Sequence, residues 1–241
     1  MKVDSSLAKK VALSCRILAK LGLVKETTGH VSCRSGDGKF MLIRGRGRDE
    51  TGLLFTRPRD IVLTDLEGKG LKNRHGIKPP NESCIHGEIY KARPEVGSVV
   101  HAHPPSVVLC TMAGIELRPI YGGYDPQGMK LALDGIPVYP SSLTLHTKEQ
   151  VHAMMEVMGR KDVCALRGHG LVVAGGSVEE ATVRAIKLDT LAKMHLQAAS
   201  LGKIPSIDEA DVQAFSARGN LQGKSVGAVW RFYVEWLEKG P

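Results

Sequence analysis

Apolar residues follow two different spacings along the chain, and these spacings divide it into expected helices and strands. Apolar positions three and four residues apart are typical of amphipathic helices, whereas short apolar runs bounded by glycine are typical of strands. The expected helices cover residues 5–21, 82–93, 105–112, 147 onward, 177–200 and 226–238. The expected strands cover residues 29–34, 40–44, 60–65, 96–103, 163–166 and 171–174.

Short polar signals mark the limits of several of these elements. Thr147 with Gln150, and Ser177 with Glu180, have the spacing of a capping box, in which two residues cap the start of one helix. Residues 66–70 contain two glycines and are expected to form a hairpin turn. Helices and strands alternate without a linker between two halves. The expected fold class is therefore α/β, in a single domain that covers residues 1–241.

The composition is that of a globular protein, with 42% hydrophobic and 24% charged residues. No apolar run approaches the roughly 20 residues that span a bilayer, and the N-terminus does not resemble a signal peptide. No membrane association is expected. The five cysteines, at positions 15, 33, 84, 110 and 164, include no C-x-x-C pair. Such scattered cysteines favour reduced thiols and a cytoplasmic location.

The net charge of +8 raises the question of an anionic partner. Aromatic residues make up only 5% of the chain, and the densest basic cluster, residues 44–48, contains two glycines and is followed by Asp49 and Glu50. This pattern is a poor match to a nucleic-acid interface. A solvated basic surface explains most such charge, and a small anionic substrate drawn in by a positive field is the functional alternative. Nucleic-acid binding is not expected.

Two histidines lie at the end of an expected apolar strand. His101 and His103 are two residues apart, so their side chains leave the same face of the strand, about 7 Å apart at the backbone. Pro104 and Pro105 end the strand directly afterwards, which places the pair near a loop. Histidines in strands are more often satisfied core residues. Two imidazoles also leave a site incomplete, because a metal centre usually takes three protein ligands and keeps one position open.

His169 and Glu82 are the candidates that complete this site. His169 lies in a Gly-His-Gly turn between two expected strands, where close backbone approach is possible. Glu82 stands at the start of an expected helix, where the helix dipole favours a carboxylate, and the alternative is that it only caps that helix. His86, four residues later, shares the same helix face and is expected to support the site or the core.

Three segments around these residues resemble the class II aldolase/adducin family. They are Thr28–Arg34, Asn81–Pro104 and Leu166–Gly175, and the resemblance in order and spacing covers roughly residues 5–200. It implies a three-layer α/β/α fold around a largely antiparallel sheet. It also implies a homotetramer with active sites at the subunit interfaces.

The same resemblance implies the chemistry of the site. One divalent metal ion per subunit, zinc or manganese, is expected on His101, His103 and His169, with Glu82 as the acid/base. Family members include aldolases, epimerases, dehydratases and decarboxylases, and also the non-enzymatic adducin heads, so membership does not fix the reaction. Adducin-like binding domains tend to lose metal ligands. The presence of all the expected ligands in this chain favours an enzyme, specifically a metal-dependent carbon–carbon lyase.

Departures from the family pattern favour one reaction. Phosphate-binding aldolases usually carry a serine pair before the glutamate and an asparagine in the upstream loop, whereas this chain has Pro80, Asn81 and His30 at these places. Residues 44–56 resemble the branch of aromatic and pyridine dicarboxylate decarboxylases. We therefore expect a decarboxylase of a hydroxylated aromatic or pyridine dicarboxylate, with His30 and Asn81 as substrate-binding residues. A structural role is the equal alternative for His30. The alternative is a sugar-phosphate aldolase or epimerase.

The remaining candidates bind or act on the rest of the substrate. A second substrate carboxylate suits a guanidinium fork from Arg44, Arg46 or Arg48, and the alternative is that these arginines only contribute surface charge. Tyr121 and Tyr124 lie in the irregular stretch where aldolases of this family carry a catalytic tyrosine. Tyr121 is the expected catalytic residue, although either tyrosine could simply pack.

Overall fold

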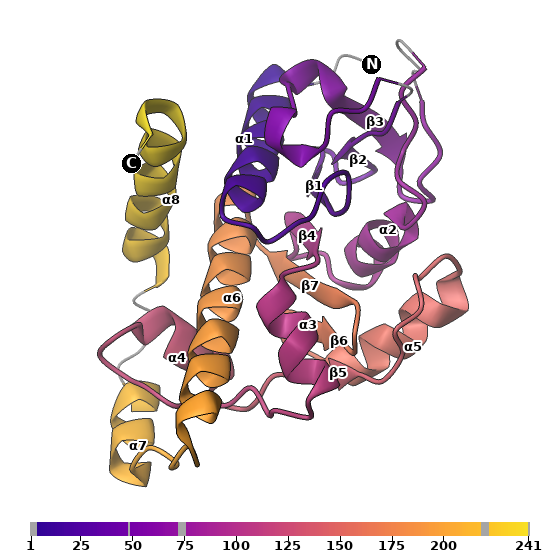
Figure 1. The fold of residues 1–241 in the computed structure, drawn as a ribbon. Helices are drawn as coiled ribbons and strands as arrows, with labels where there is room; N and C mark the ends of the chain where they lie inside the picture. The colour runs from indigo at the N-terminus through magenta and orange to yellow at the C-terminus, as the bar shows by residue number, and fades with distance from the viewer. Residues whose placement is uncertain (1–3, 48, 72–75, 218–221, 241) are drawn as a thin grey trace.

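A single seven-stranded sheet forms the centre of the protein (Figure 1). The computed structural model describes residues 4–47, 49–71, 76–217 and 222–240. The strands are β1 (His30–Arg34), β2 (Phe40–Arg44), β3 (Ile61–Asp65), β4 (Ser98–Ala102), β5 (Val138–Tyr139), β6 (Val163–Leu166) and β7 (Gly170–Gly175). Their order in the sheet is β3-β2-β1-β4-β7-β6-β5, and only β5 and β6 run parallel to each other. The sheet is therefore largely antiparallel, as expected.

Helices cover both faces of this sheet. They are α1 (Ser5–Lys20), α2 (Ser83–Ala92), α3 (Pro105–Met112), α4 (Pro126–Ala132), α5 (Lys148–Met158), α6 (Val178–Leu201), α7 (Glu209–Ala217) and α8 (Gln222–Lys239), with short 3-10 turns at Leu53–Phe55 and Pro58–Asp60. Helices α1, α3 and α6 pack on one face, and α8 lies against α1 and α6, whereas α2 and α5 cover the opposite face (Figure 1). The expected three-layer α/β/α fold class is confirmed.

The alternation of side chains along β4 separates the two layers. Val100 and Ala102 belong to the core on the α1, α3 and α6 side, whereas Val99 belongs to the core on the α2 and α5 side. Because side chains repeat every second residue along a strand, His101 shares the face of Val99 and points toward α2. The same rule directs His30 and Ser32 of β1 toward α2. The register of the sheet therefore brings these polar side chains under one helix.

The structure differs from the sequence expectations at a few places. Helices α4 and α7 and the two-residue strand β5 were not expected. Strand β4 ends at Ala102, so His103 lies just beyond it. The Thr147–Gln150 capping box is confirmed. At the start of α6 only half of the expected box forms, because the Glu180 carboxylate accepts from the amide of Gly176 at 2.7 Å, not from that of Ser177.

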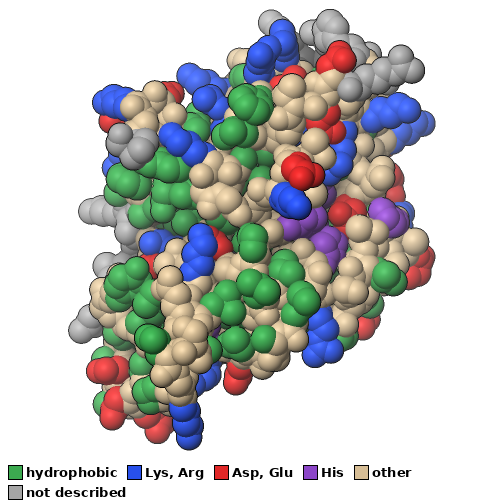
Figure 2. Space-filling model, in the orientation of Figure 1, with side chains coloured by type: hydrophobic (Ala, Val, Ile, Leu, Met, Phe, Trp, Pro, Cys, Tyr) green, Lys and Arg blue, Asp and Glu red, His purple; other side chains and the backbone are tan. Residues whose placement is uncertain are grey.

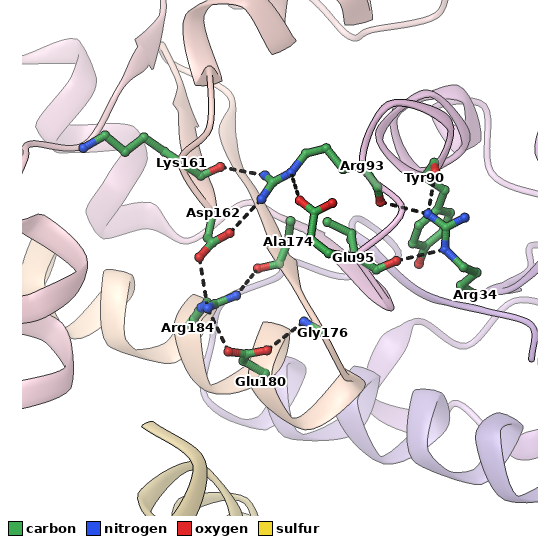
Figure 3. Close-up of polar contacts among 11 residues, drawn as sticks. Arg34, Tyr90, Arg93, Glu95, Lys161, Asp162, Ala174, Gly176, Glu180 and Arg184 are labelled. Atoms are coloured by element: carbon green, nitrogen blue, oxygen red, sulfur yellow. Dashed lines mark hydrogen bonds and ion pairs between the residues drawn. The ribbon is translucent and has the colours of Figure 1, made fainter. Parts of the chain in front are cut away.

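Arginines join several segments at the end of the sheet where β1 ends and β4 begins, the opposite end from His101. Figure 3 shows their contacts. Arg34, at the end of β1, Arg93, after α2, and Arg184, in α6, each donate to several neighbouring segments. Their acceptors include the main-chain carbonyls of Tyr90, Arg93, Val96, Lys161 and Ala174 and the carboxylates of Glu95, Asp162 and Glu180. These bonds tie both helical layers to the sheet.

A search of the described helices finds none that is long and apolar enough to cross a membrane. The expectation of a single domain over residues 1–241 stays a prediction.

Candidate metal centre

Four side chains from three separate segments meet at one end of the sheet. One ligand atom from each of Glu82, His101, His103 and His169 lies within 4.8 Å of the others. The ring centroids of the three histidines are 4.8–5.0 Å apart. This is the group that the sequence predicted, and we refer to it as the metal group. Figure 2 shows histidine side chains reaching the surface, with basic and acidic side chains close beside them.

Tight backbone geometry allows the histidines to converge. The Nε2 atoms of His101 and His103 are 2.9 Å apart, although His103 already lies outside the strand. His169 follows Gly168, whose φ of +62° is a left-handed conformation that favours glycine. A Cβ atom on Gly170 would lie 2.2 Å from the carbonyl oxygen of Ala102. Glycine on both sides of His169 therefore permits the turn to lie against the end of β4.

The contacts of the histidines direct ring nitrogens toward the centre of the metal group. His101 Nδ1 donates to the carbonyl oxygen of Leu171 at 2.9 Å, which leaves the lone pair of Nε2 available. Both ring nitrogens of His169 are buried and have no hydrogen-bond partner among the described residues. Buried polar atoms in native proteins are nearly always paired. Three imidazoles and one carboxylate are a donor set that suits zinc or manganese, so the residues present fit the expected metal ion.

Burial keeps these imidazoles in the form that binds metal. Burial, followed by the repulsion of a positive charge on His101 or His169, lowers the pKa of His103 to about 3. Burial also lowers the pKa of His169, again helped by His101. Neutral imidazole is the form that binds metal. At neutral pH both rings therefore have lone pairs to offer.

Glu82 points into the metal group and does not cap its own helix. It occupies the residue before α2, but its side chain makes no capping hydrogen bond there. Its Oε1 accepts from the backbone amide of Leu145 at 2.8 Å. Its two oxygens lie 3.5 Å from His101 Nε2 and 3.9 Å from His169 Nε2. Burial opposes ionisation of Glu82, but His101 and the Leu145 amide outweigh it and lower its pKa to about 2.

The three candidate arginines have different surroundings. Arg44 is buried and forms an ion pair with Glu50, so its charge is largely neutralised inside the protein. Arg46 is partly buried, and its Nε has no partner among the described residues. Arg48 lies outside the described residues. A cavity of about 840 Å³ is lined by Arg44, Arg46, Arg59, Lys78, Asp49 and Glu50, among others, but by none of the metal group.

The other predicted residues take up three different positions. His30 is buried, its ring centroid lies 4.9 Å from that of His101, and burial and its neighbours lower its pKa well below the usual value. Asn81 is exposed and directly precedes Glu82. The hydroxyl of Tyr121 is buried beside α4 and has no hydrogen-bond partner among the described residues. No contact in the described chain joins Tyr121 to the metal group.

Sequence reasoning missed two polar residues beside the site, Ser32 and Tyr90. Both hydroxyls are buried and belong to a hydrogen-bonded chain that ends at His30. A signal was present in the spacing. Ser32 lies two residues after His30 on a strand, and Tyr90 lies four residues after His86 on a helix. These spacings place each pair on one face, but only the packing of β1 against α2 brings the two faces together.

Comparisons with known proteins agree with this arrangement. A sequence model of the family described as "Class II Aldolase and Adducin N-terminal domain" matches residues 9–196. The 3,4-dihydroxyphthalate decarboxylase of Arthrobacter keyseri is 42% identical over 219 residues, which cover 88% of each chain. The enzyme of the same name from Terrabacter sp. (strain DBF63) is also 42% identical, over 93% of this chain and 94% of its own.

A solved structure shows the same fold. The L-fuculose 1-phosphate aldolase from Glaciozyma antarctica PI12 superimposes with a TM-score of 0.82 at 21% identity, over 98% of this chain and 90% of its own. The relatives confirm the expected class of activity, a lyase. With residues 9–196 matched, the chain belongs to the family of class II aldolase and adducin N-terminal domains.

Proposed function

We propose that this protein is a divalent-metal-dependent decarboxylase of a hydroxylated aromatic dicarboxylate, of the class that its relatives' name, 3,4-dihydroxyphthalate decarboxylase, describes. The observation that carries the proposal is the convergence of three imidazoles and one carboxylate, with both ring nitrogens of His169 buried and unpaired in the described chain. The similarity to two decarboxylases over most of the chain supports this reaction over the other reactions of the family.

His101, His103 and His169 would hold one zinc or manganese ion per subunit. When bound, the ion supplies Lewis acidity at an oxygen of the substrate and so stabilises the negative charge that develops when carbon dioxide leaves. The chain's own contribution is orientation. The His101 Nδ1 bond to Leu171 fixes the direction of that ring before a ligand arrives.

Glu82 is the proposed acid/base. Because its pKa is lowered to about 2, it is a carboxylate at neutral pH and has first to accept a proton. The ring hydroxyl of the substrate provides that proton on binding. When the carbon–carbon bond breaks, its electron pair stays on the ring carbon, and this carbon takes the proton back from Glu82 while carbon dioxide departs. Glu82 thus returns to its starting form, and the product leaves with a deprotonated ring oxygen, which takes its proton from solvent.

Arg46 is the proposed partner of the second substrate carboxylate. The Nε atoms of both Arg44 and Arg46 lack a partner in the described chain, but the Arg44 guanidinium is already paired with Glu50 through Nη1. The positive charge of Arg46 is near enough to contribute to the lowered pKa values of His30 and His103. His30 and Asn81 remain proposed substrate-binding residues, and Arg48 does too, although it lies outside the described residues.

Assembly and location are proposals too. A homotetramer with active sites between subunits is expected from the family resemblance. Within one chain the Tyr121 hydroxyl lies beside α4. The catalytic role proposed for Tyr121 therefore requires this assembly, in which it would act at a site between subunits. A cytoplasmic location stays a prediction from the five cysteines, all of which are free.

The test combines metal content with carbon dioxide release. Purified protein is expected to hold one equivalent of zinc or manganese and to release carbon dioxide from 3,4-dihydroxyphthalate. Pyridine dicarboxylates and ketose phosphates are the comparison substrates. Aldehyde release from ketose phosphates, with no carbon dioxide from any dicarboxylate, would replace the proposal with a sugar-phosphate aldolase. Protein that binds no metal and turns over none of these compounds would indicate an adducin-like binding domain.

A further inference from the structure

Four buried side chains form a hydrogen-bonded chain that leads to the metal group. The Tyr90 hydroxyl lies 2.6 Å from Ser32 Oγ, which lies 2.6 Å from His86 Nδ1. His86 Nε2 lies 2.7 Å from His30 Nδ1. All four side chains are at most 1% exposed, and the ring of His30 packs against that of His101. We call these four residues the tyrosine–histidine chain.

The hydrogen bonds of this chain have one favoured direction. Apart from Ser32 Oγ, the only hydrogen-bonding group near the Tyr90 oxygen in the described chain is the backbone amide of Val99, which can only donate, so this hydroxyl donates to Ser32. The Ser32 hydroxyl then donates its own proton to His86 Nδ1. His86 therefore carries its proton on Nε2 and donates it to His30 Nδ1. It follows that neutral His30 carries its proton on Nε2.

The opposite direction is disfavoured by the number of available acceptors. It would require Ser32 to donate to Tyr90, and the buried Tyr90 proton would then have no acceptor in the described chain. A buried donor without an acceptor is costly. A positively charged His86 would not change the result, because its Nε2 would still donate to His30. The tautomer of His30 thus follows from the geometry and does not depend on titration of His86.

We propose that Tyr90, Ser32 and His86 are positioning residues, which fix the proton of His30 on Nε2 so that this N–H donates a hydrogen bond to an anionic oxygen of the substrate at the metal group. The inference rests on the proposed function for the identity of that substrate. His30 Nε2 has no other partner among the described residues and lies across the ring from the nitrogen that faces His86. A fixed N–H donor on His30 favours ligands that place an oxygen acceptor beside Nε2 and disfavours ligands that place a hydrogen-bond donor there.

The tyrosine–histidine chain holds this proton but does not supply it to the reaction. If His30 lost its Nε2 proton to the substrate, His86 would have to supply a new proton to His30. Ser32 would then supply His86, and Tyr90 would supply Ser32, which would leave a buried tyrosinate. Burial raises the pKa of Tyr90, so this end of the chain is a poor proton source. His30 therefore binds substrate, and proton transfer stays with Glu82.

Nitrogen-15 NMR of the zinc-loaded full-length protein tests the tautomer without any turnover. The His30 resonances, assigned by their loss in His30→Gln, are expected to show a protonated Nε2 and an unprotonated Nδ1. Addition of phthalate, which lacks the ring hydroxyls, is expected to shift the Nε2 resonance. A protonated Nδ1, or an Nε2 resonance that does not respond to saturating phthalate, would overturn the inference.

A pair of serine variants tests the role of the chain in binding. In Ser32→Ala, either tautomer of His86 leaves one buried nitrogen unpaired, so the two tautomers become close in free energy. We expect mixed His30 resonances and a KM for 3,4-dihydroxyphthalate raised about tenfold, with kcat nearly unchanged. Ser98→Ala is the matched control, because Ser98 is equally buried and donates to the Ser32 carbonyl at 2.6 Å, outside the chain.

The outcomes separate this inference from the proposed function. If the NMR results are as expected but no dicarboxylate loses carbon dioxide, only the proposed reaction is wrong, and phthalate affinity replaces KM as the measurement for the variants. If carbon dioxide is released but Ser32→Ala behaves like Ser98→Ala, the positioning role is wrong. Should Ser32→Ala fail to fold, the spectra of the unsubstituted protein still decide the question.

Discussion

The polar side chains at the two ends of the central strands differ in how fully they are hydrogen-bonded. Strand β1 begins at His30 beside the metal group and ends at Arg34 in the arginine network. At the arginine end each guanidinium donates to several carbonyls or carboxylates (Figure 3). At the histidine end both ring nitrogens of His169 are buried without a normal hydrogen bond in the described chain, and Glu82 Oε1 lies 3.9 Å from Nε2.

This difference separates structure from function within one sheet. Satisfied polar groups, such as those around Arg34 and Arg93, stabilise the fold by joining segments that are distant in sequence. Unsatisfied buried groups cost free energy unless a ligand completes them. The histidine end is therefore the part of the molecule that is completed from outside. Changes at this end should alter binding and activity, and changes at the other end should alter stability.

His169→Ala should have the largest effect and should break the histidine end alone. Removal of one of three imidazoles is expected to lower metal content to well below one equivalent. Loss of the metal ion removes several kcal/mol of transition-state stabilisation, or at least about a thousandfold in kcat/KM. The melting temperature of the metal-free variant should change little from that of the metal-free parent, because the His169 ring makes only a 3.9 Å contact with Glu82 and a weak interaction with the Leu143 backbone.

His152→Ala is the matched control for this prediction. His152 is a half-exposed histidine on α5 that pairs with Glu88, away from the metal group. Metal content and kcat/KM should both be retained in it. Full activity in His169→Ala, measured by carbon dioxide release and elemental analysis, would show that the unpaired ring nitrogens are not a mark of ligand binding.

The sequence predicted the metal group better than it predicted the surroundings of the candidate arginines. Period-two spacing identified His101 and His103, and the glycine turn identified His169, because both signals are local. Arg44 was expected to bind substrate or lie on the surface, yet it is buried against Glu50. No regular element links these two residues, so no spacing rule could pair them. Long-range polar contacts depend on strand register and helix packing, which the sequence does not display directly.

The missed elements have equally physical explanations. Helix α4 is only seven residues long, although Asp125 as its cap and Pro126 in its first turn were readable signals. Helix α7 has no buried residue among its nine, so it lacks the apolar periodicity on which sequence prediction relies. Strands β1, β2 and β6, whose apolar runs are buried in the sheet, were predicted almost to the residue.

Arg34→Met should have the next largest effect and should break the arginine end alone. The variant leaves the carbonyls of Tyr90, Val96 and Arg93 without their donor. Loss of hydrogen bonds from a charged group costs about 2–3 kcal/mol of unfolding free energy, which corresponds to a melting temperature roughly 4–12 °C lower. The kcat/KM of the protein that remains folded at 25 °C should be unchanged.

Arg160→Met provides the control for a lost surface charge. Arg160 is exposed and makes no ion pair or hydrogen bond among the described residues, so its replacement should leave the melting temperature within the measurement error. If Arg34→Met instead lowered kcat/KM as strongly as it lowered stability, the two ends of the sheet would not be independent. Two features would then connect the two ends physically. One is strand β1, which both ends share. The other is Tyr90, whose backbone carbonyl accepts from Arg34 and whose hydroxyl belongs to the tyrosine–histidine chain.

Glu67→Gln should have the smallest effect, and it separates charge pairing from burial. Glu67 forms ion pairs with Lys91 and Lys148, and these contacts lower its pKa from 4.5 to about 2 although it is exposed. A carboxylate with a lowered pKa stabilises the folded state fully above pH 4.5, and this contribution is lost as the pH falls toward 2. Because all three side chains are substantially solvent-accessible, the difference in unfolding free energy between parent and Glu67→Gln should stay below about 1 kcal/mol at pH 7.

Urea denaturation at pH 7 and pH 3 measures this difference in unfolding free energy. Both proteins have the same metal group, so the comparison cancels acid effects at the histidines. The difference should shrink between these pH values, whereas Glu156→Gln, at an exposed position with no ion pair in the described chain, should show none. A difference as large as that of Arg34→Met would mean that exposed charge pairs stabilise this fold as much as the arginine network does.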